Sequence, residues 1–248
     1  MNGATFVLVH GAYHGSWCFE KLVAQLEQHG HKAVGVDLPL CPDKTTSVSM
    51  EDCMAAMEAV IPEGTEPVIL CGHSNGGHFI TAFAERHPQR VKELVYITAT
   101  LLPDGCSAFD EPVLRSDCPK PRREENAVCK WYPVESEEDF VTVWNYFYTG
   151  ANRADALWAV QRIKPQPLEC LATPNRLTPQ RFGSVGRSYV LCTADRCMSA
   201  ALQRTMLEKL PCRVFELESG HSPFMTHPER LAEILCEIKE NPAAKPTE

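Results

Sequence analysis

The pattern Gly-His-Ser-Asn-Gly at residues 72–76 places Ser74 between two glycines, after the apolar run 67–71 and before an amphipathic run at 76–87. A Gly-x-Ser-x-Gly turn that joins a strand to a helix holds its serine in a strained conformation with the hydroxyl exposed. The pentapeptide alone also occurs at ordinary glycine-rich helix starts, but this context favours chemistry. We therefore predict that Ser74 is a nucleophile.

A serine hydroxyl is a weak nucleophile, so it needs a base within hydrogen-bond reach and an acid that orients the base. His221 follows the last apolar run and a Ser-Gly turn, whereas its nearest rival, His227, directly precedes a proline at the start of a helical pattern. Asp195 lies just after the fifth apolar run, and Asp104, after the fourth, is the alternative acid. We predict a triad of Ser74, His221 and Asp195.

Acyl transfer also needs two backbone N–H groups that bind the oxyanion. In this kind of turn, one N–H group comes from the residue after the nucleophile and the other from the loop after the first strand. We therefore predict that the amides of Asn75 and Ala12 are the two donors. His10 and His14 are four residues apart in that same loop, with no carboxylate nearby in sequence. That spacing in a loop is weak support for a metal site. We therefore expect no metal site there.

Short apolar runs alternate with longer amphipathic ones along the chain, which predicts an α/β fold with a mostly parallel, six-stranded sheet flanked by helices. The runs of strand length are 5–10, 32–37, 67–71, 91–98, 188–193 and 213–217. The runs with helical spacing are 17–29, 50–61, 76–87, 198–210 and 228–240. This order brings the ends of several strands to one edge of the sheet, where the predicted triad would meet.

The segment 102–187 interrupts this alternation and holds three of the four tryptophans. It is too long for a plain crossover and too aromatic for a solvated loop. We predict a mainly helical cap there, between core segments 1–101 and 188–241, with a disordered tail at 242–248; an insertion with its own small core is the alternative. Trp131, Trp144 and Tyr148 are candidate substrate-binding residues, although a purely structural role fits them equally.

Composition restricts the partners. The chain has 248 residues, of which 24 are Lys or Arg and 32 are Asp or Glu, so its net charge of −8 offers no electrostatic footprint for nucleic acid or for an anionic membrane. No stretch approaches the roughly twenty apolar residues of a spanning helix. The start lacks the basic region and apolar core of a signal peptide. We expect a cytoplasmic enzyme that acts on a small molecule.

Several separate motifs resemble the α/β-hydrolase family, and within it the branch of plant methylesterases and hydroxynitrile lyases with their bacterial homologues. They are His-Gly-Ala-Tyr-His-Gly-Ser-Trp at 10–17, Gly-His-Ser-Asn-Gly-Gly at 72–77, Cys-Thr-Ala-Asp at 192–195, Gly-His-Ser-Pro-Phe at 220–224 and the cap stretch 156–168. The resemblance implies a cofactor-free enzyme on small esters, with Ser74, Asp195 and His221 as the triad. Members of this branch often form dimers through the cap surface, so the resemblance is compatible with a homodimer.

Three positions depart from this branch. Hydroxynitrile lyases carry threonine where this chain has Gly11 and lysine where it has Ser222, and without that lysine nothing nearby stabilises a leaving cyanide. Asn75 stands where relatives often have an apolar residue, so the pocket is expected to be more polar. The expected activity is therefore hydrolysis of small methyl or aryl esters through an acyl-enzyme. Cleavage of C–C or amide bonds by the same triad, and a small-ligand receptor with weak catalysis, are the alternatives.

Overall fold

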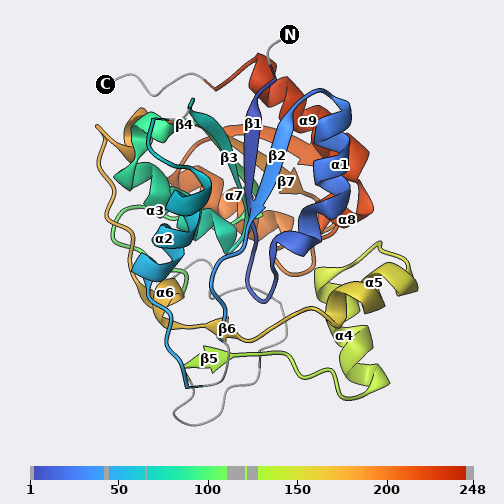
Figure 1. Ribbon diagram of the computed structural model, residues 1–248. Coiled ribbons are helices and arrows are strands. Elements are labelled where there is room, and N and C mark those ends of the chain that lie inside the picture. Colours follow the sequence, from blue (N-terminus) through green and yellow to red (C-terminus); the bar gives the residue numbers. More distant parts are fainter. Residues whose placement is uncertain (1–2, 42–44, 65, 111–120, 122–127, 244–248) are drawn as a thin grey trace.

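Six parallel strands form one sheet in the order β2-β1-β3-β4-β7-β8 (Figure 1). The computed structural model describes residues 3–41, 45–64, 66–110, 121 and 128–243. The strands are β1 Thr5–Val9, β2 Lys32–Val36, β3 Val68–Ser74, β4 Val91–Ala99, β7 Gly186–Cys192 and β8 Arg213–Leu217. The six-stranded parallel sheet expected from the sequence is confirmed. Strand β3 runs three residues past its predicted end, which makes Ser74 its last residue.

Helices cover both faces of this sheet because successive strand side chains point to opposite sides. Val7 and Val9 pack with one helical layer, and Phe6 and Leu8 pack with the other. The first layer contains α2 Met50–Val60, α3 Gly76–Arg86 and α7 Ala200–Lys209; the second contains α1 Glu20–Gln28, α8 Pro223–Thr226 and α9 Pro228–Glu240. The 3-10 turns η1 Ser16–Phe19 and η2 Pro88–Arg90 precede α1 and β4.

The segment between β4 and β7 lies at the end of the molecule toward which β1 and β2 point (Figure 1). Its described part contains α4 Glu137–Phe147, α5 Arg153–Val160, α6 Glu169–Ala172, η4 Phe182–Ser184 and a short antiparallel ribbon of β5 Cys129–Lys130 and β6 Gln166–Pro167. Sequence patterning did not predict the ribbon, because two-residue strands carry no periodicity. The predicted domain boundaries at 101, 187 and 241 stay predictions.

Two kinds of contact hold the α5 region of this segment on the core. Lys21 of α1 donates to Asp155 of α5 at 2.7 Å, and the ring of Trp17 meets the ring of Trp158 edge to face. The ion pair is partly exposed, so its contribution to stability is small, whereas the aromatic contact buries apolar surface. Packing of aromatic side chains is therefore the larger contribution to cap docking.

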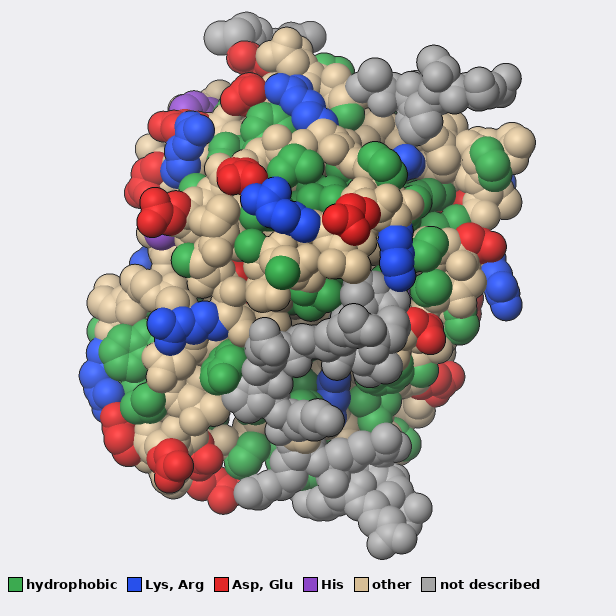
Figure 2. Space-filling model, turned by 180° about the vertical axis from the view of Figure 1, so that it is seen from behind, with side chains coloured by type: hydrophobic (Ala, Val, Ile, Leu, Met, Phe, Trp, Pro, Cys, Tyr) green, Lys and Arg blue, Asp and Glu red, His purple; other side chains and the backbone are tan. Residues whose placement is uncertain are grey.

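The surface mixes charges of both signs. Figure 2 shows Lys and Arg side chains interspersed with Asp and Glu side chains on the face opposite to that of Figure 1. Charged side chains form exposed ion pairs, among them Arg204 with Glu216 and Arg230 with Glu233, both at 2.7 Å. None of the helices in the described ranges is long and apolar enough to cross a membrane.

Of the tail predicted to be disordered, only residues 242 and 243 fall within the described part; 244–248 lie outside it. The amide of Ala243 donates to the buried carboxyl of Glu93 at 3.0 Å. The other Glu93 oxygen accepts from the Ser188 hydroxyl at 2.6 Å, so this buried carboxyl is satisfied on both sides. Burial raises the pKa of Glu93.

Gly77→Ala is predicted to destabilise the fold, because a Cβ at that position would overlap the carbonyl oxygen of Thr100 and lie 3.0 Å from the Ala99 Cβ. Overpacking of this kind costs about 1–3 kcal/mol of unfolding free energy, measured by urea denaturation. Ala55→Ser, which adds one atom on the exposed side of α2, is the matched control and should change little. Equal stability of the two variants would contradict this close approach.

Candidate active site

The turn at the end of β3 presents Ser74 in a conformation that serine seldom adopts. Its φ is +51°, and the side chain is partly exposed although the rest of β3 is buried. Helix α3 begins two residues later at Gly76, where a Cβ would overlap the carbonyl oxygen of Val9 in β1. The glycine therefore lets strand and helix approach closely enough to make the sharp turn. Positive φ in a non-glycine residue stores strain, which is typical of an exposed nucleophile.

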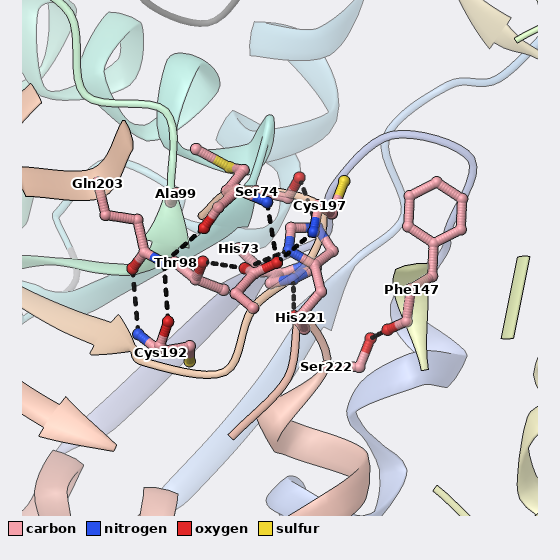
Figure 3. Close-up of polar contacts among 12 residues, drawn as sticks. His73, Ser74, Thr98, Ala99, Phe147, Cys192, Cys197, Gln203, His221 and Ser222 are labelled. Carbon is pink, nitrogen blue, oxygen red and sulfur yellow. Dashed lines mark hydrogen bonds and ion pairs between the residues drawn. The ribbon is translucent and has the colours of Figure 1, made fainter. Parts of the chain in front are cut away.

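The structure brings Ser74, His221 and Asp195 together (Figure 3). His221 lies in the loop between β8 and α8, and its Nε2 is 3.1 Å from Ser74 Oγ. Its Nδ1 is 2.7 Å from Oδ2 of Asp195, which lies in the loop between β7 and α7. Because a carboxylate can only accept, Nδ1 carries the proton, which leaves Nε2 free to accept from the serine hydroxyl. This is the geometry that a serine nucleophile and its base require.

The carboxylate of Asp195 is buried, with 5% of the residue exposed, and four hydrogen bonds hold it. Its Oδ1 accepts from the backbone amides of Cys197 at 2.7 Å and Met198 at 2.8 Å. Its Oδ2 accepts from the hydroxyl of Thr98 as well as from His221. A buried charge is tolerated when it is paired and hydrogen-bonded in this way.

A fully buried glutamine fixes the loop that carries Asp195 (Figure 3). Gln203 of α7 accepts from the Cys192 amide at 3.0 Å and donates to the Cys192 carbonyl at 2.9 Å. The same side chain donates to the Met198 carbonyl at 2.6 Å. Both ends of the loop are therefore tied to one side chain, and the acid is presented at a fixed position.

The two residues predicted to supply oxyanion donors flank the nucleophile. Asn75 immediately precedes α3, where backbone N–H groups have no partner within the helix and favour negative charge. Its side-chain Oδ1 accepts from the Thr100 hydroxyl at 3.2 Å, so the polar side chain is held against β4. Ala12 lies in the loop after β1, and its carbonyl accepts from His14 Nδ1 at 2.7 Å. Their part in binding an oxyanion stays a prediction.

His10 and His14, whose spacing suggested a metal only weakly, use both ring nitrogens in protein hydrogen bonds. His10 bonds the Gly11 carbonyl at 2.8 Å and the Leu38 amide at 3.1 Å. His14 bonds the Ala12 carbonyl and, through Nε2, the Tyr148 hydroxyl at 2.8 Å. Burial lowers the pKa of both, that of His14 to about 3, so both rings are neutral. Within the described residues, no group of three or more His, Cys, Asp or Glu is arranged to hold a metal ion.

Asp104 and His227, the alternative acid and base, have other hydrogen-bond partners. Asp104 accepts from the Leu177 amide at 2.7 Å on the exposed surface. His227 caps the start of α9, as its position before a proline predicted, and contacts the Thr226 hydroxyl at 2.9 Å. The sequence favoured Asp195 over Asp104, and in the structure Asp195 contacts His221.

The three aromatic residues predicted to bind substrate have other described contacts. Tyr148 is fully buried and bonds His14, and Trp144 Nε1 donates to the Ala151 carbonyl at 3.0 Å within the cap. Trp131 is half-buried. Their role in substrate binding stays a prediction.

Sequence reasoning missed Phe147, whose ring centroid lies 6.0 Å from that of His221. Tyr13 and Tyr132 pack against Phe147, with centroids at 5.9 Å and 5.2 Å. The buried Ser222 hydroxyl donates to the Phe147 carbonyl at 2.7 Å and so ties α4 to the loop of His221 (Figure 3). The run Tyr146-Phe147-Tyr148 was the only signal for this cluster, because sequence does not say which of three adjacent aromatics faces the base.

The sheet order, the turn at Ser74 and the placement of His221 agree with the family comparison. The sequence profile described as "Alpha/beta hydrolase family" matches residues 6–234, which is most of the chain. The chain belongs to the alpha/beta hydrolase family. The fold class and family resemblance predicted from the sequence are thereby confirmed.

Similar proteins point to one branch of the alpha/beta hydrolases. Methylesterase 7 of Arabidopsis thaliana is 29% identical, with 96% of this chain and 97% of that protein covered. Salicylic acid-binding protein 2 of Nicotiana tabacum is also 29% identical, with the same coverage. Among solved structures, a pyrethroid hydrolase from Sphingobium faniae JZ-2 superposes with a TM-score of 0.79 at 24% identity, covering 97% of this chain and 99% of that one.

Asp195→Asn is predicted to lower kcat for ester hydrolysis by about 10⁴-fold, because an amide in place of the carboxylate no longer holds His221 in the productive tautomer. Asp104→Asn is the matched control: it makes the same chemical change at the rival acid and should leave kcat nearly unchanged. Steady-state kinetics on p-nitrophenyl acetate provide the measurement. A large loss in the Asp104 variant with little in the Asp195 variant would reverse the assignment.

Proposed function

We propose that this alpha/beta hydrolase is a serine carboxylic ester hydrolase that acts on small esters through an acyl-enzyme. One observation carries the proposal: the imidazole of His221 lies between the Ser74 hydroxyl at 3.1 Å and the Asp195 carboxylate at 2.7 Å. An alcohol, a base and an orienting acid in this geometry are the parts that acyl transfer needs.

In the proposed reaction, Ser74 Oγ attacks the ester carbonyl carbon while His221 Nε2 takes its proton. The amides of Asn75 and Ala12 bind the oxyanion, and each such donor is typically worth about 3 kcal/mol of transition-state stabilisation. His221 then gives its proton to the leaving alcohol, which departs and leaves the acyl group on Ser74. Water then attacks the acyl carbon while His221 Nε2 takes a proton from it; the bond to Ser74 Oγ breaks, His221 returns the proton to Oγ, and the carboxylic acid is released. Asp195 stabilises the imidazolium that forms in both halves of the reaction.

The surroundings of His221 support a small substrate with an apolar part. Phe147 lies beside the imidazole, and Tyr13 and Tyr132 extend the aromatic surface away from it. Such surfaces bind apolar groups of ligands and exclude water from the reacting atoms. The names of relatives agree, since they include a methylesterase and a pyrethroid hydrolase. We propose methyl and aryl esters as the substrate class.

Lyase chemistry is disfavoured by two positions near the nucleophile. A side chain at Gly11 would place its Cβ 2.7 Å from the Ser74 Cβ, so the threonine of hydroxynitrile lyases does not fit this backbone. Ser222, where those enzymes have lysine, is buried and engaged with Phe147. Ser222 therefore supplies no cation for a leaving cyanide.

A receptor function is the second candidate, because the tobacco relative is named for binding salicylic acid. A protein that only binds has no need of a strained serine hydroxyl 3.1 Å from an imidazole. We therefore place hydrolysis first. A cytoplasmic location and a homodimer stay predictions.

Ser74→Ala is predicted to lower kcat for p-nitrophenyl acetate by about a million-fold while leaving the unfolding midpoint close to that of the parent. The parent protein should also react with a fluorophosphonate, with one label per chain on Ser74. A panel of methyl esters, aryl esters, anilides and cyanohydrins, scored by kcat/KM, separates ester hydrolysis from the other reactions. Turnover by Ser74→Ala at the rate of the parent would contradict the mechanism. Tight binding of an aromatic acid by a parent protein that the fluorophosphonate does not label would favour the receptor function.

A further inference from the structure

The pairing of β3 with β4 is irregular at the end of β4. His73 of β3 pairs with Ile97 of β4, but the next residue, Ser74, pairs with Ala99, so Thr98 is an extra residue in the ladder. The φ of Thr98 is +38°, a region that β-branched residues rarely adopt, and the residue is fully buried. Bulges of this kind re-aim a side chain and are frequent next to active sites. The strain requires support from the surrounding structure.

A tyrosine hydroxyl supplies that support. The hydroxyl of Tyr189 in β7 accepts from the Ala99 amide at 3.0 Å and donates to the Ala99 carbonyl at 2.9 Å. On the other side, the Thr100 amide donates to the Ser74 carbonyl at 2.9 Å. Hydrogen bonds to the backbone of Ala99 and Thr100 therefore hold the chain immediately after Thr98 and support the bulge.

The bulge directs the Thr98 hydroxyl at the acid of the proposed triad. This hydroxyl donates to Asp195 Oδ2, the same oxygen that faces His221 Nδ1, whereas the backbone amides of Cys197 and Met198 occupy Oδ1 (Figure 3). Rotation of the carboxylate about its Cβ–Cγ bond would break bonds to both oxygens. The donor also withdraws negative charge from the oxygen that attracts the imidazolium.

We propose that Thr98 is a positioning residue of this active site, which fixes the Asp195 carboxylate toward His221 and limits how strongly that carboxylate holds the imidazolium. The inference rests on the proposed function, because it concerns the same base. Weaker attraction keeps His221 neutral, and so able to accept the serine proton, down to a lower pH. Thr98 thus extends the working range of the base toward acid.

Burial keeps four titratable groups that face this pair in their neutral forms. His73 from β3 and His14 from the loop after β1 face His221, and burial holds the pKa of both far below the usual range. Tyr189 and Cys192 from β7 face Asp195, and burial raises the pKa of each well above its usual value.

The test compares Thr98→Val, which keeps the β-branched shape and removes the hydroxyl, with Thr98→Ser, which keeps the hydroxyl. In Thr98→Val the acid limb of the pH profile, where kcat/KM rises with pH, should move to higher pH by about one pH unit. The reason is that the carboxylate, without the hydrogen bond from the hydroxyl, attracts the imidazolium more strongly. The plateau should fall by no more than about tenfold, since His221 and the two amides still hold Asp195. Thr98→Ser should keep the parent limb.

Thr81→Val is the matched control, because it removes another buried threonine hydroxyl, one that bonds the Gly77 carbonyl at 2.8 Å and Tyr96. It should leave the acid limb in place. A merely structural loss at Thr98 would loosen the contact between Asp195 and His221 and move the limb to lower pH, so a downward or absent shift in Thr98→Val overturns the proposal. If the valine variant does not fold, Thr98→Ala gives the same readout with less crowding at positive φ.

A substrate-free measurement separates this inference from the proposed function. The His221 ring is titrated by NMR in the parent and in each variant, with its signal assigned by its loss in His221→Ala. The titration midpoint should rise in Thr98→Val and stay in Thr98→Ser, whether or not any ester is cleaved. A raised midpoint in a protein that hydrolyses no ester would support the positioning role and contradict the proposed function; an unchanged midpoint would contradict the positioning role alone.

Discussion

The contact on which the rest of this structure depends is the one between the His221 imidazole and its two neighbours, Ser74 Oγ and Asp195 Oδ2. A base can take a proton from an alcohol only when its ring is neutral, carries the correct tautomer and faces the hydroxyl. Asp195 meets the tautomer requirement, because its carboxylate can only accept the Nδ1 proton. The three residues come from the ends of β3, β7 and β8, so the parallel sheet decides whether they meet.

Strain at this edge of the sheet is concentrated where β3 and β4 lose register. Ser74 and Thr98 both have positive φ, and both adjoin the shift between His73 and Ser74 in the pairing of these strands. Conformations of this kind cost about 1–3 kcal/mol each, so they persist only where the surroundings enforce them. The close approach of α3 to β1 and β4, and the Tyr189 hydroxyl bound to Ala99, supply that enforcement. The same distortion thus exposes the nucleophile and aims a donor at the acid.

The cap side of the site is built from neutral rings. His14, held neutral by burial, links the loop after β1 to Tyr148 of the cap, and Phe147 packs beside His221. The Ser222 hydroxyl joins the loop of His221 to the backbone of Phe147. These contacts reduce the water around the base, which strengthens electrostatic interactions within the site. They also link the position of His221 to the packing of α4.

Local patterns in the sequence were sufficient for the sheet, its flanking helices, the turn at Ser74 and the identity of His221, because each depends on periodicity or on residue types close together in the chain. The tertiary structure decided the remainder. Asp195 and Asp104 both follow buried strands, and the parallel pairing of β7 with β8 places Asp195 beside His221. Thr98 is 97 residues from Asp195 in sequence, and its orientation depends on one extra residue in a strand. No short-range pattern records such a contact, because its energy comes from groups that only the folded chain brings together.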